Sequence, residues 1–136
     1  SNQNVSFKRV RIRKLIKKLD EEGLDTNKIL LTIDNLSESN IAINYFVELN
    51  LSNNTITMDD GKKFLINEPF FLNPNEIIFR SLSKILTYVG RKYYPPRGRS
   101  LSHLIARLKA SDFKKTTLSS CIIEKVNNLV IIYKEK

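Results

Sequence analysis

Residues 91–107 combine cationic and aromatic side chains at close spacing. Five of these side chains are cations and two are tyrosines: Arg91, Lys92, Tyr93, Tyr94, Arg97, Arg99 and Arg107. Arginine binds phosphate through paired hydrogen bonds, and tyrosine rings stack on exposed bases. Pro95-Pro96 stiffens the segment, which limits the entropy lost on binding. These residue types predict a nucleic-acid contact in which the cations and Tyr94 take part.

A purely structural interpretation of the same segment stays open. Tyr93 and Tyr94 can pack the loop onto the core, and we expect at least one of them to do so. Pro95-Pro96 can simply enforce a turn, and the arginines can be solvated surface charge. The burial or exposure of the two tyrosines therefore distinguishes the structural interpretation from the binding one.

A second cationic stripe lies near the N-terminus. Arg9, Arg13 and Lys17 are four residues apart, so on a helix they share one face. This stripe is a second candidate nucleic-acid contact. The alternatives are a solvated helix face and a contact with the acidic middle of the chain.

Catalytic and metal-binding constellations are not found in the sequence. The chain has one cysteine and one histidine, which exclude an internal disulfide, a multi-Cys zinc site and a multi-His metal centre. We expect His103 on a helix face, Cys121 in a buried strand, and Asp59-Asp60-Gly61 in a hairpin turn. No phosphate-binding glycine motif is present, so we assign no catalytic residue and no metal ligand.

Charge is unevenly distributed along the 136 residues, whose net charge is +9. Residues 1–24 carry a net +4, residues 25–78 a net −5 and residues 79–115 a net +9. A merely solubilising surface mixes the two signs more evenly. The segregation favours an anionic partner.

Helical periodicity defines four segments. Residues 7–22 place Ile12, Leu15, Ile16 and Leu19 on one stripe, with Gly23 as the terminator. A long helix, capped by Asp25 or Thr26, runs to about Leu49 and could break near its serines. Its expected buried positions are Ile29, Ile33, Leu36, Ile43 and Val47.

The other two helices follow turn and cap signals. Asn73 is the expected N-cap of the third, with Pro74 at its first position and Gly90 as its stop. Ser100 is the expected cap of the fourth. The buried positions of these two helices are Ile78, Leu82, Ile85 and Val89, then Leu101, Leu104, Ile105 and Leu108.

Two hairpins complete the predicted elements. Residues 54–67 form the first hairpin, with Asp59-Asp60-Gly61 as its turn. Residues 121–123 and 129–133 form the strands of the second, with Asn127-Asn128 as the turn candidate. The predicted fold class is α+β: helices with two β-hairpins, in which a long connecting helix precedes a small substrate-recognition domain.

Three motifs resemble the tRNA(Ile)-lysidine synthase family. Ser1-Asn2, Phe7 and Arg9-Val10-Arg11-Ile12-Arg13 resemble the family's Asp-x-Ser-Asn, spacer and Arg-Asn-x-Ile-Arg pattern, with Val10 in place of Asn. The second motif is Gly90–Arg97, followed by a leucine-rich helix. The third is Thr117–Ile123, which resembles Thr-Leu-Gly-Gly-Cys-x-Ile, with Ser119 and Ser120 in place of the glycines. Together they cover nearly the whole chain.

The resemblance implies an ATP-dependent ligase that joins lysine to the wobble cytidine of a minor isoleucine tRNA. The family's ATP-pyrophosphatase loop, Ser-Gly-Gly-x-Asp-Ser, is absent from this sequence, which is expected to be a C-terminal fragment without catalytic activity of its own. ATP and Mg are expected only for the full-length enzyme, and none for this fragment. Residues 1–24 are then the end of the catalytic domain, 25–50 a connecting helix and 54–136 a tRNA-recognition domain.

The expected partners are minor isoleucine tRNA and the protein's own N-terminal catalytic domain, with self-association into a homodimer through the apolar stripe. No membrane span or signal peptide is visible, so we expect a cytoplasmic and, from the many Lys, Ile and Asn residues, bacterial protein. The main rival is a structural interdomain module with little RNA affinity. An independent DNA-binding domain ranks low, since no helix-turn-helix or zinc pattern is present.

Overall fold

The computed structural model of the chain describes residues 2–136, and it describes side chains from Asn4 onward. Ser1, which begins the first of the three motifs, lies outside the described residues. The chain divides into two compact units, one that extends up to Ile41 and one that comprises Ala42–Lys136.

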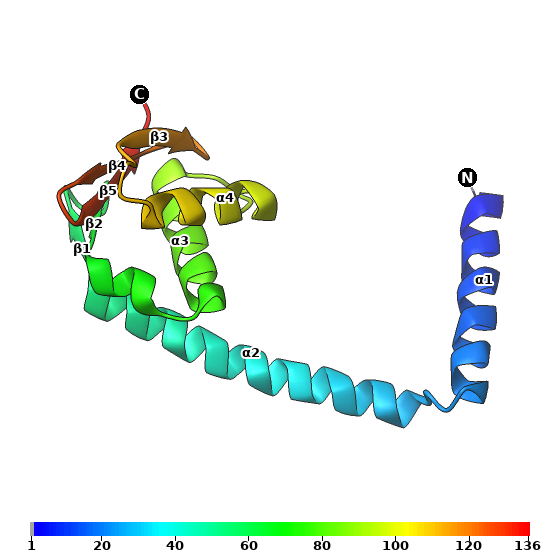
Figure 1. Cartoon of the computed structure of the whole chain (residues 1–136). Coiled ribbons are helices and arrows are strands. Elements are labelled where there is room, and N and C mark those ends of the chain that lie inside the picture. Colours follow the sequence, from blue (N-terminus) through cyan, green and yellow to red (C-terminus); the bar gives the residue numbers. More distant parts are fainter. Residues whose placement is uncertain (1) are drawn as a thin grey trace. The chain divides into compact units, whose positions relative to one another are not determined.

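The described elements are four α-helices, one 3-10 helix and five strands, which confirms the α+β class (Figure 1). The helices are α1 (Asn2–Glu21), α2 (Thr26–Asn54), η1 (Glu68–Leu72), α3 (Asn75–Gly90) and α4 (Gly98–Lys109). The strands are β1 (Thr55–Met58), β2 (Lys63–Ile66), β3 (Lys115–Leu118), β4 (Cys121–Val126) and β5 (Leu129–Lys134). None of the described helices is long and apolar enough to cross a membrane.

The first unit contains α1 and the beginning of α2, joined by a short turn. Gly23 has a φ of +92°, in the left-handed region, and ends α1 as expected. Asp25 caps α2 by accepting a hydrogen bond of 2.9 Å from the backbone N–H of Lys28. The apolar stripe of α1 is exposed, at 54% for Ile12 and 53% for Leu15. The periodicity therefore identified an apolar face that the described unit leaves uncovered.

Two expectations about α2 are wrong. The helix continues without a break through its serines and ends at Asn54, beyond Leu49. Ile33 and Leu36, expected to be buried, are 53% and 65% exposed, whereas Val47, in the second unit, is fully buried. Periodicity reports which face of a helix is apolar and says nothing about what covers it.

The second unit is built on one antiparallel sheet with the strand order β1-β2-β5-β4-β3. Both predicted hairpins are present, but β2 also pairs with β5, so that the two hairpins form a single sheet. The sequence pattern did not reveal β3, which is only four residues long and pairs with β4. Ser119 and Ser120 turn between them at φ values of 54° and 60°. These φ values lie in the left-handed region, which glycine adopts most easily, and the family pattern has glycines at these two positions.

The core lies between the sheet and the two helices α3 and α4. α3 lies beside α4 and the sheet, where it contacts β4, β5 and α4 (Figure 1). Its predicted buried positions Ile78, Leu82, Ile85 and Val89 are all buried. The predicted positions of α4 are buried as well: Leu101, Leu104, Ile105 and Leu108. The inner face of the sheet adds Ile66, Ile123, Val130 and Ile132, and η1 adds Phe70. The segment between α3 and α4 is thus held at both ends by well-packed helices.

Three predicted helix ends need correction. The amide of Asn73 donates to Asn50 Oδ1 at 3.0 Å and to the carbonyl of Phe70 at 3.2 Å, so it secures η1 and α2 and does not cap α3. Ser100 lies inside α4, whose N-cap is Arg97. Gly90 is the last residue of α3, but the left-handed residue that ends the helix is Arg91, at φ 53° and ψ 48°.

Candidate nucleic-acid interface

The candidate loop, residues 91–97, is fixed firmly at its start. The backbone N–H groups of Arg91 and Lys92 donate to the carbonyls of Tyr88 and Thr87, at 3.2 and 3.1 Å. Gly90 lies against the turn between β3 and β4, where a Cβ would come within 2.2 Å of the carbonyl oxygen of Ser119. Only glycine permits this approach, so the close packing of α3 on that turn sets where the loop leaves the helix.

Both loop tyrosines are exposed, at 97% for Tyr93 and 81% for Tyr94. The expectation that at least one of them packs onto the core is therefore wrong. The core beside α3 and α4 is already filled by other apolar side chains, and the fixed φ angles of Pro95-Pro96 restrict the path of the loop between the helices. Two flat aromatic rings on a protein surface are available for stacking.

The cations of the loop have no side-chain partner among the described residues, unlike several other cations of residues 79–115. Arg80 forms an ion pair with Glu76 at 2.7 Å, Lys84 pairs with Glu48, and Lys109 donates to Asn75 Oδ1 at 3.3 Å. Within the described part of the chain, no hydrogen bond or ion pair engages the side chains of the loop and its helix junction: Arg91, Lys92, Arg97 and Arg99. Four cations without a side-chain partner therefore flank the exposed tyrosines along the chain.

Arg107 occupies a different position from the loop. It lies eight residues after Arg99 on α4, about 12 Å along the helix axis. Its guanidinium donates to Thr116 Oγ1 at 3.2 Å and lies 5.2 Å from the centre of the Phe113 ring. His103 is exposed midway between the two arginines, on the same helix face. Arg107 thus extends the cationic surface along α4, with part of its guanidinium already engaged.

The N-terminal candidates Arg9, Arg13 and Lys17 are exposed on α1. Arg9 and Arg13 line a shallow depression together with Val5, Ser6 and Val10. These residues belong to the first unit and the loop to the second, so the two cationic sets are separate candidates.

Catalytic chemistry gains no support from the remaining candidates. Cys121 is fully buried, and burial raises the pKa of its thiol to about 11, against the opposing effect of Lys134 and Lys92. Asp59 and Asp60 form the β1–β2 turn with φ values of 52° and 54°. Among the described residues, no group of three or more His, Cys, Asp or Glu side chains is arranged to hold a metal ion.

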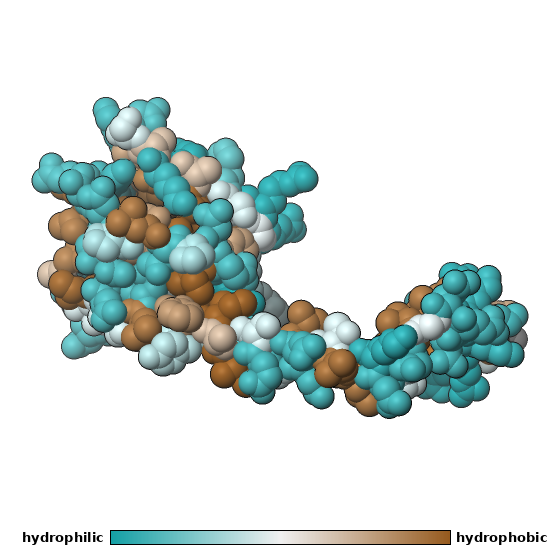
Figure 2. Space-filling view, turned by 60° about the horizontal axis from the view of Figure 1, so that its bottom comes forward, coloured by the Kyte–Doolittle hydropathy of each residue, from teal (hydrophilic) through white to brown (hydrophobic). Residues whose placement is uncertain are grey.

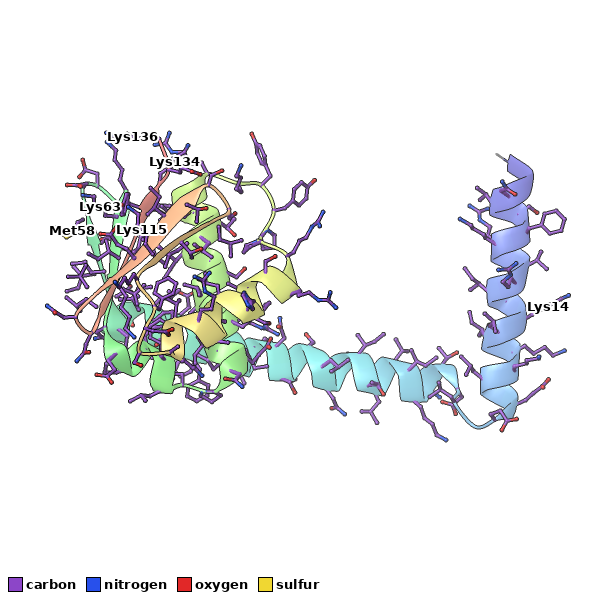
Figure 3. The ribbon with its side chains drawn as sticks, turned by 45° about the horizontal axis from the view of Figure 1, so that its top comes forward. Lys14, Met58, Lys63, Lys115, Lys134 and Lys136 are labelled. Atoms are coloured by element: carbon purple, nitrogen blue, oxygen red, sulfur yellow. The ribbon has the colours of Figure 1, made fainter. Side chains whose placement is uncertain are left out.

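Sequence reasoning missed a cavity next to the loop. It has a volume of about 540 Å³ and lies between the β1–β2 turn, the end of α3 and the end of β5. Arg91 belongs to both the cavity and the loop, while Lys62 comes from the β1–β2 turn and Lys134 from the end of β5, which is distant in sequence. Lys63, Lys134 and Lys136 lie at the same end of the sheet (Figure 3). These lysines come together only because β2 pairs with β5, so no local sequence pattern could have predicted the cavity.

The second unit is a small α+β domain that presents an exposed loop of arginines and tyrosines. The chain is 27% identical over 136 residues to the tRNA(Ile)-lysidine synthases of Wolbachia pipientis wMel and of Wolbachia sp. subsp. Brugia malayi (strain TRS). It is 24% identical over 123 residues to that of Ruegeria pomeroyi. These matches cover 99% and 90% of the chain and confirm its resemblance to the tRNA(Ile)-lysidine synthases.

The chain spans about a third of the length of these curated relatives, 32% for the two Wolbachia proteins and 29% for the Ruegeria protein. No protein-family model matches the chain. No solved structure matches it either.

Proposed function

We propose that the second unit is a tRNA-binding region of a tRNA(Ile)-lysidine synthase. The whole enzyme would be the ATP-dependent ligase that joins lysine to the wobble cytidine of a minor isoleucine tRNA, and ATP and Mg would act in its catalytic part. The observation that carries the proposal is the loop, in which two almost fully exposed tyrosines stand among unpaired arginines. The resemblance to the lysidine synthases supports RNA as the polyanion.

The loop would act as a preorganised clamp. Arg97 and Arg99 would bind phosphates through bidentate hydrogen bonds, and Tyr93 and Tyr94 would stack on exposed bases. The double proline and the anchored N–H groups of Arg91 and Lys92 keep the loop in place, so little conformational entropy is lost on binding. Arg107 would contact a further phosphate along α4, since an RNA backbone can be touched at several points.

For the first unit we propose a partner within the same enzyme. Hydrophobic side chains are exposed between hydrophilic ones along α1 and the start of α2 (Figure 2). Ile12, Leu15, Ile16 and Leu19 would pack on the catalytic domain, or on a second copy of the chain where that domain is absent. Arg9, Arg13 and Lys17, which lie on the same helix, would then provide a second set of RNA contacts. A cytoplasmic, bacterial setting is part of the proposal.

The test measures binding of the 136-residue chain to a transcript of the minor isoleucine tRNA and to an elongator methionine tRNA across a salt series. Changing Arg91, Arg97 and Arg99 to Ala should weaken binding and reduce the steepness of its salt dependence by about 1 for each phosphate that is no longer bound. Lys84→Ala with Lys109→Ala, whose side chains already have partners, is the control. Unchanged affinity in the triple variant would count against the loop.

A second candidate is an interdomain module with little RNA affinity of its own. The exposed apolar residues of α1 and α2 favour it, because they require a protein partner in any case. Its signature is weak binding, equal for both tRNAs, at every salt concentration.

A further inference from the structure

The cavity between the β1–β2 turn, the end of α3 and the end of β5 has an electropositive lining. Five of its side chains are cations: Lys62, Lys63, Arg91, Lys134 and Lys136. Two carboxylates, Asp59 and Asp60, also line it, and Asp59 forms an ion pair with Lys63 at 3.7 Å. Four cations thus face one remaining carboxylate, so the cavity favours an anion.

Tyr88 gives the cavity a fixed aromatic wall. Its ring meets the Phe64 ring edge to face, with 5.9 Å between centroids. A Cβ at Gly61 would lie 2.8 Å from Tyr88 Oη, so the turn glycine, at φ +81°, admits the ring. Tyr88 nevertheless remains 62% exposed. A ring that is held on two sides and open on the rest is suited to stacking.

Tyr133, on β5, is a second aromatic residue in the lining of the cavity. Its hydroxyl donates to Glu124 Oε2 at 3.1 Å, and the Lys63 ammonium lies 5.8 Å from its ring centre. The cavity therefore combines immobilised aromatic rings with side-chain cations that have no other partner among the described residues, chiefly Lys62, Lys134 and Lys136. A simple anion would contact only the cations, whereas a nucleotide would contact the cations through its phosphate and the aromatic rings through its base.

We propose that this cavity binds one unpaired nucleotide of an RNA strand, with its base stacked on Tyr88 and its phosphates held by Lys62, Arg91 and Lys134. A volume of about 540 Å³ lies within the roughly 300–1,000 Å³ of small-ligand sites and accommodates a nucleotide. Arg91 is also the first residue of the loop, so a strand held by the loop would reach the cavity without leaving the cationic surface. The inference rests on the proposed function, since it takes its ligand from the same RNA.

The test follows each tyrosine separately. The chain has five tyrosines and no tryptophan, so labelling with 3-fluorotyrosine gives up to five fluorine NMR signals, assigned by single Tyr→Phe variants. Tyr88 and Tyr133 report on the cavity, Tyr93 and Tyr94 on the loop, and Tyr45 is the reference. The full 136-residue chain is titrated with three ligands: a 5′-phosphorylated RNA trinucleotide, adenosine monophosphate and inorganic phosphate.

We expect the trinucleotide to shift the Tyr88 signal at a lower concentration than the mononucleotide, and phosphate to leave it in place. Lys62→Ala with Lys134→Ala should raise the required trinucleotide concentration by roughly tenfold or more. The control, Lys84→Ala with Lys109→Ala, loses the same charge away from the cavity and should leave the titration unchanged. The lysines are exposed, so neither variant threatens the fold.

Four results would overturn the inference. The first three are an unmoved Tyr88 signal, an equal response to phosphate, and equal weakening in the lysine variant and its control. The fourth is a mononucleotide that binds as well as the trinucleotide, because the ligand would then be a free nucleotide and not an RNA strand. The loop is judged independently by the signals of Tyr93 and Tyr94 and by tRNA binding of Arg97→Ala with Arg99→Ala. A failure of the cavity is therefore distinguishable from a failure of the proposed function.

Discussion

Replacing Tyr93 and Tyr94 together by alanine separates a binding role from a structural one. The two rings are 97% and 81% exposed and have no ring contact with another described residue. Surface substitutions of this kind usually change the free energy of unfolding by no more than about 0.5 kcal/mol. Truncating a packed aromatic side chain would instead cost about 3–5 kcal/mol. The structure therefore predicts a variant that is as stable as the unchanged chain.

RNA binding should respond in the opposite way. Stacking of a base on an aromatic side chain is worth about 1–3 kcal/mol, so removal of both rings should weaken tRNA binding by at least about tenfold. Because a tyrosine releases no counterions, the slope of log K against log salt should stay the same. The arginine variant, in contrast, should change that slope.

Urea unfolding and filter binding across a salt series measure the two quantities. Tyr45→Ala is the matched control, since Tyr45 is also exposed, at 63%, but lies on α2 away from the loop. A loss of stability above about 1 kcal/mol would show that the rings pack against the protein. Unchanged affinity at unchanged stability would refute the stacking argument.

Three further predictions concern the scaffold that holds the loop. Gly90→Ala should destabilise the chain by about 1–3 kcal/mol in urea unfolding, because the carbonyl of Ser119 cannot retreat from a Cβ placed 2.2 Å away, whereas Gly98→Ala, with its nearest neighbour at 3.7 Å, should be tolerated. Asn50→Ala should cost about 2–4 kcal/mol by the same measurement, since its amide donates to Ser81 Oγ at 3.2 Å and its oxygen accepts from Asn54 and Asn73; an effect below about 1 kcal/mol would contradict this network. Cys121 should react slowly with thiol reagents at neutral pH, because burial raises its pKa to about 11. An unfolded thiol loses its proton near pH 8.5, so the folded chain should lose stability as the pH rises from about 9 to about 11, and Cys121→Ala should abolish that part of the decline.

The predictable part of this fold is the part that local signals encode. The buried faces of α3 and α4 follow from apolar residues at helical spacing, as Ile78, Leu82 and Ile85 illustrate. The turns at Asp59-Asp60-Gly61 and at Asn127 are set by residues that tolerate a positive φ. These signals act over a few residues and need no knowledge of the rest of the chain.

Contacts between distant segments were not predictable in the same way. The pairing of Lys63 with Tyr133 across β2 and β5 joins the two hairpins, and no spacing in the sequence indicates it. The cap assigned to Asn73 failed for the same reason, because its Nδ2 group donates to Asn50 and Phe70 and so holds the side chain on residues outside α3. The cavity depends entirely on such contacts, whereas the loop lies within one segment and was recognisable from its residue types.

The tyrosines and the charge of the loop give two separate readouts of its partner. An acidic protein surface would neutralise Arg97 and Arg99 as well as RNA does, so charge alone does not distinguish an interdomain module from an RNA-binding region. Exposed tyrosines and arginines also anchor protein interfaces, so the two rings alone do not identify the partner, whereas the response of tRNA binding to their removal does. If the arginine variant bound tRNA weakly while the tyrosine variant kept its affinity, the loop would be a general phosphate clamp. Weak binding by both variants would require bases as well as phosphates, and only a nucleic acid supplies both.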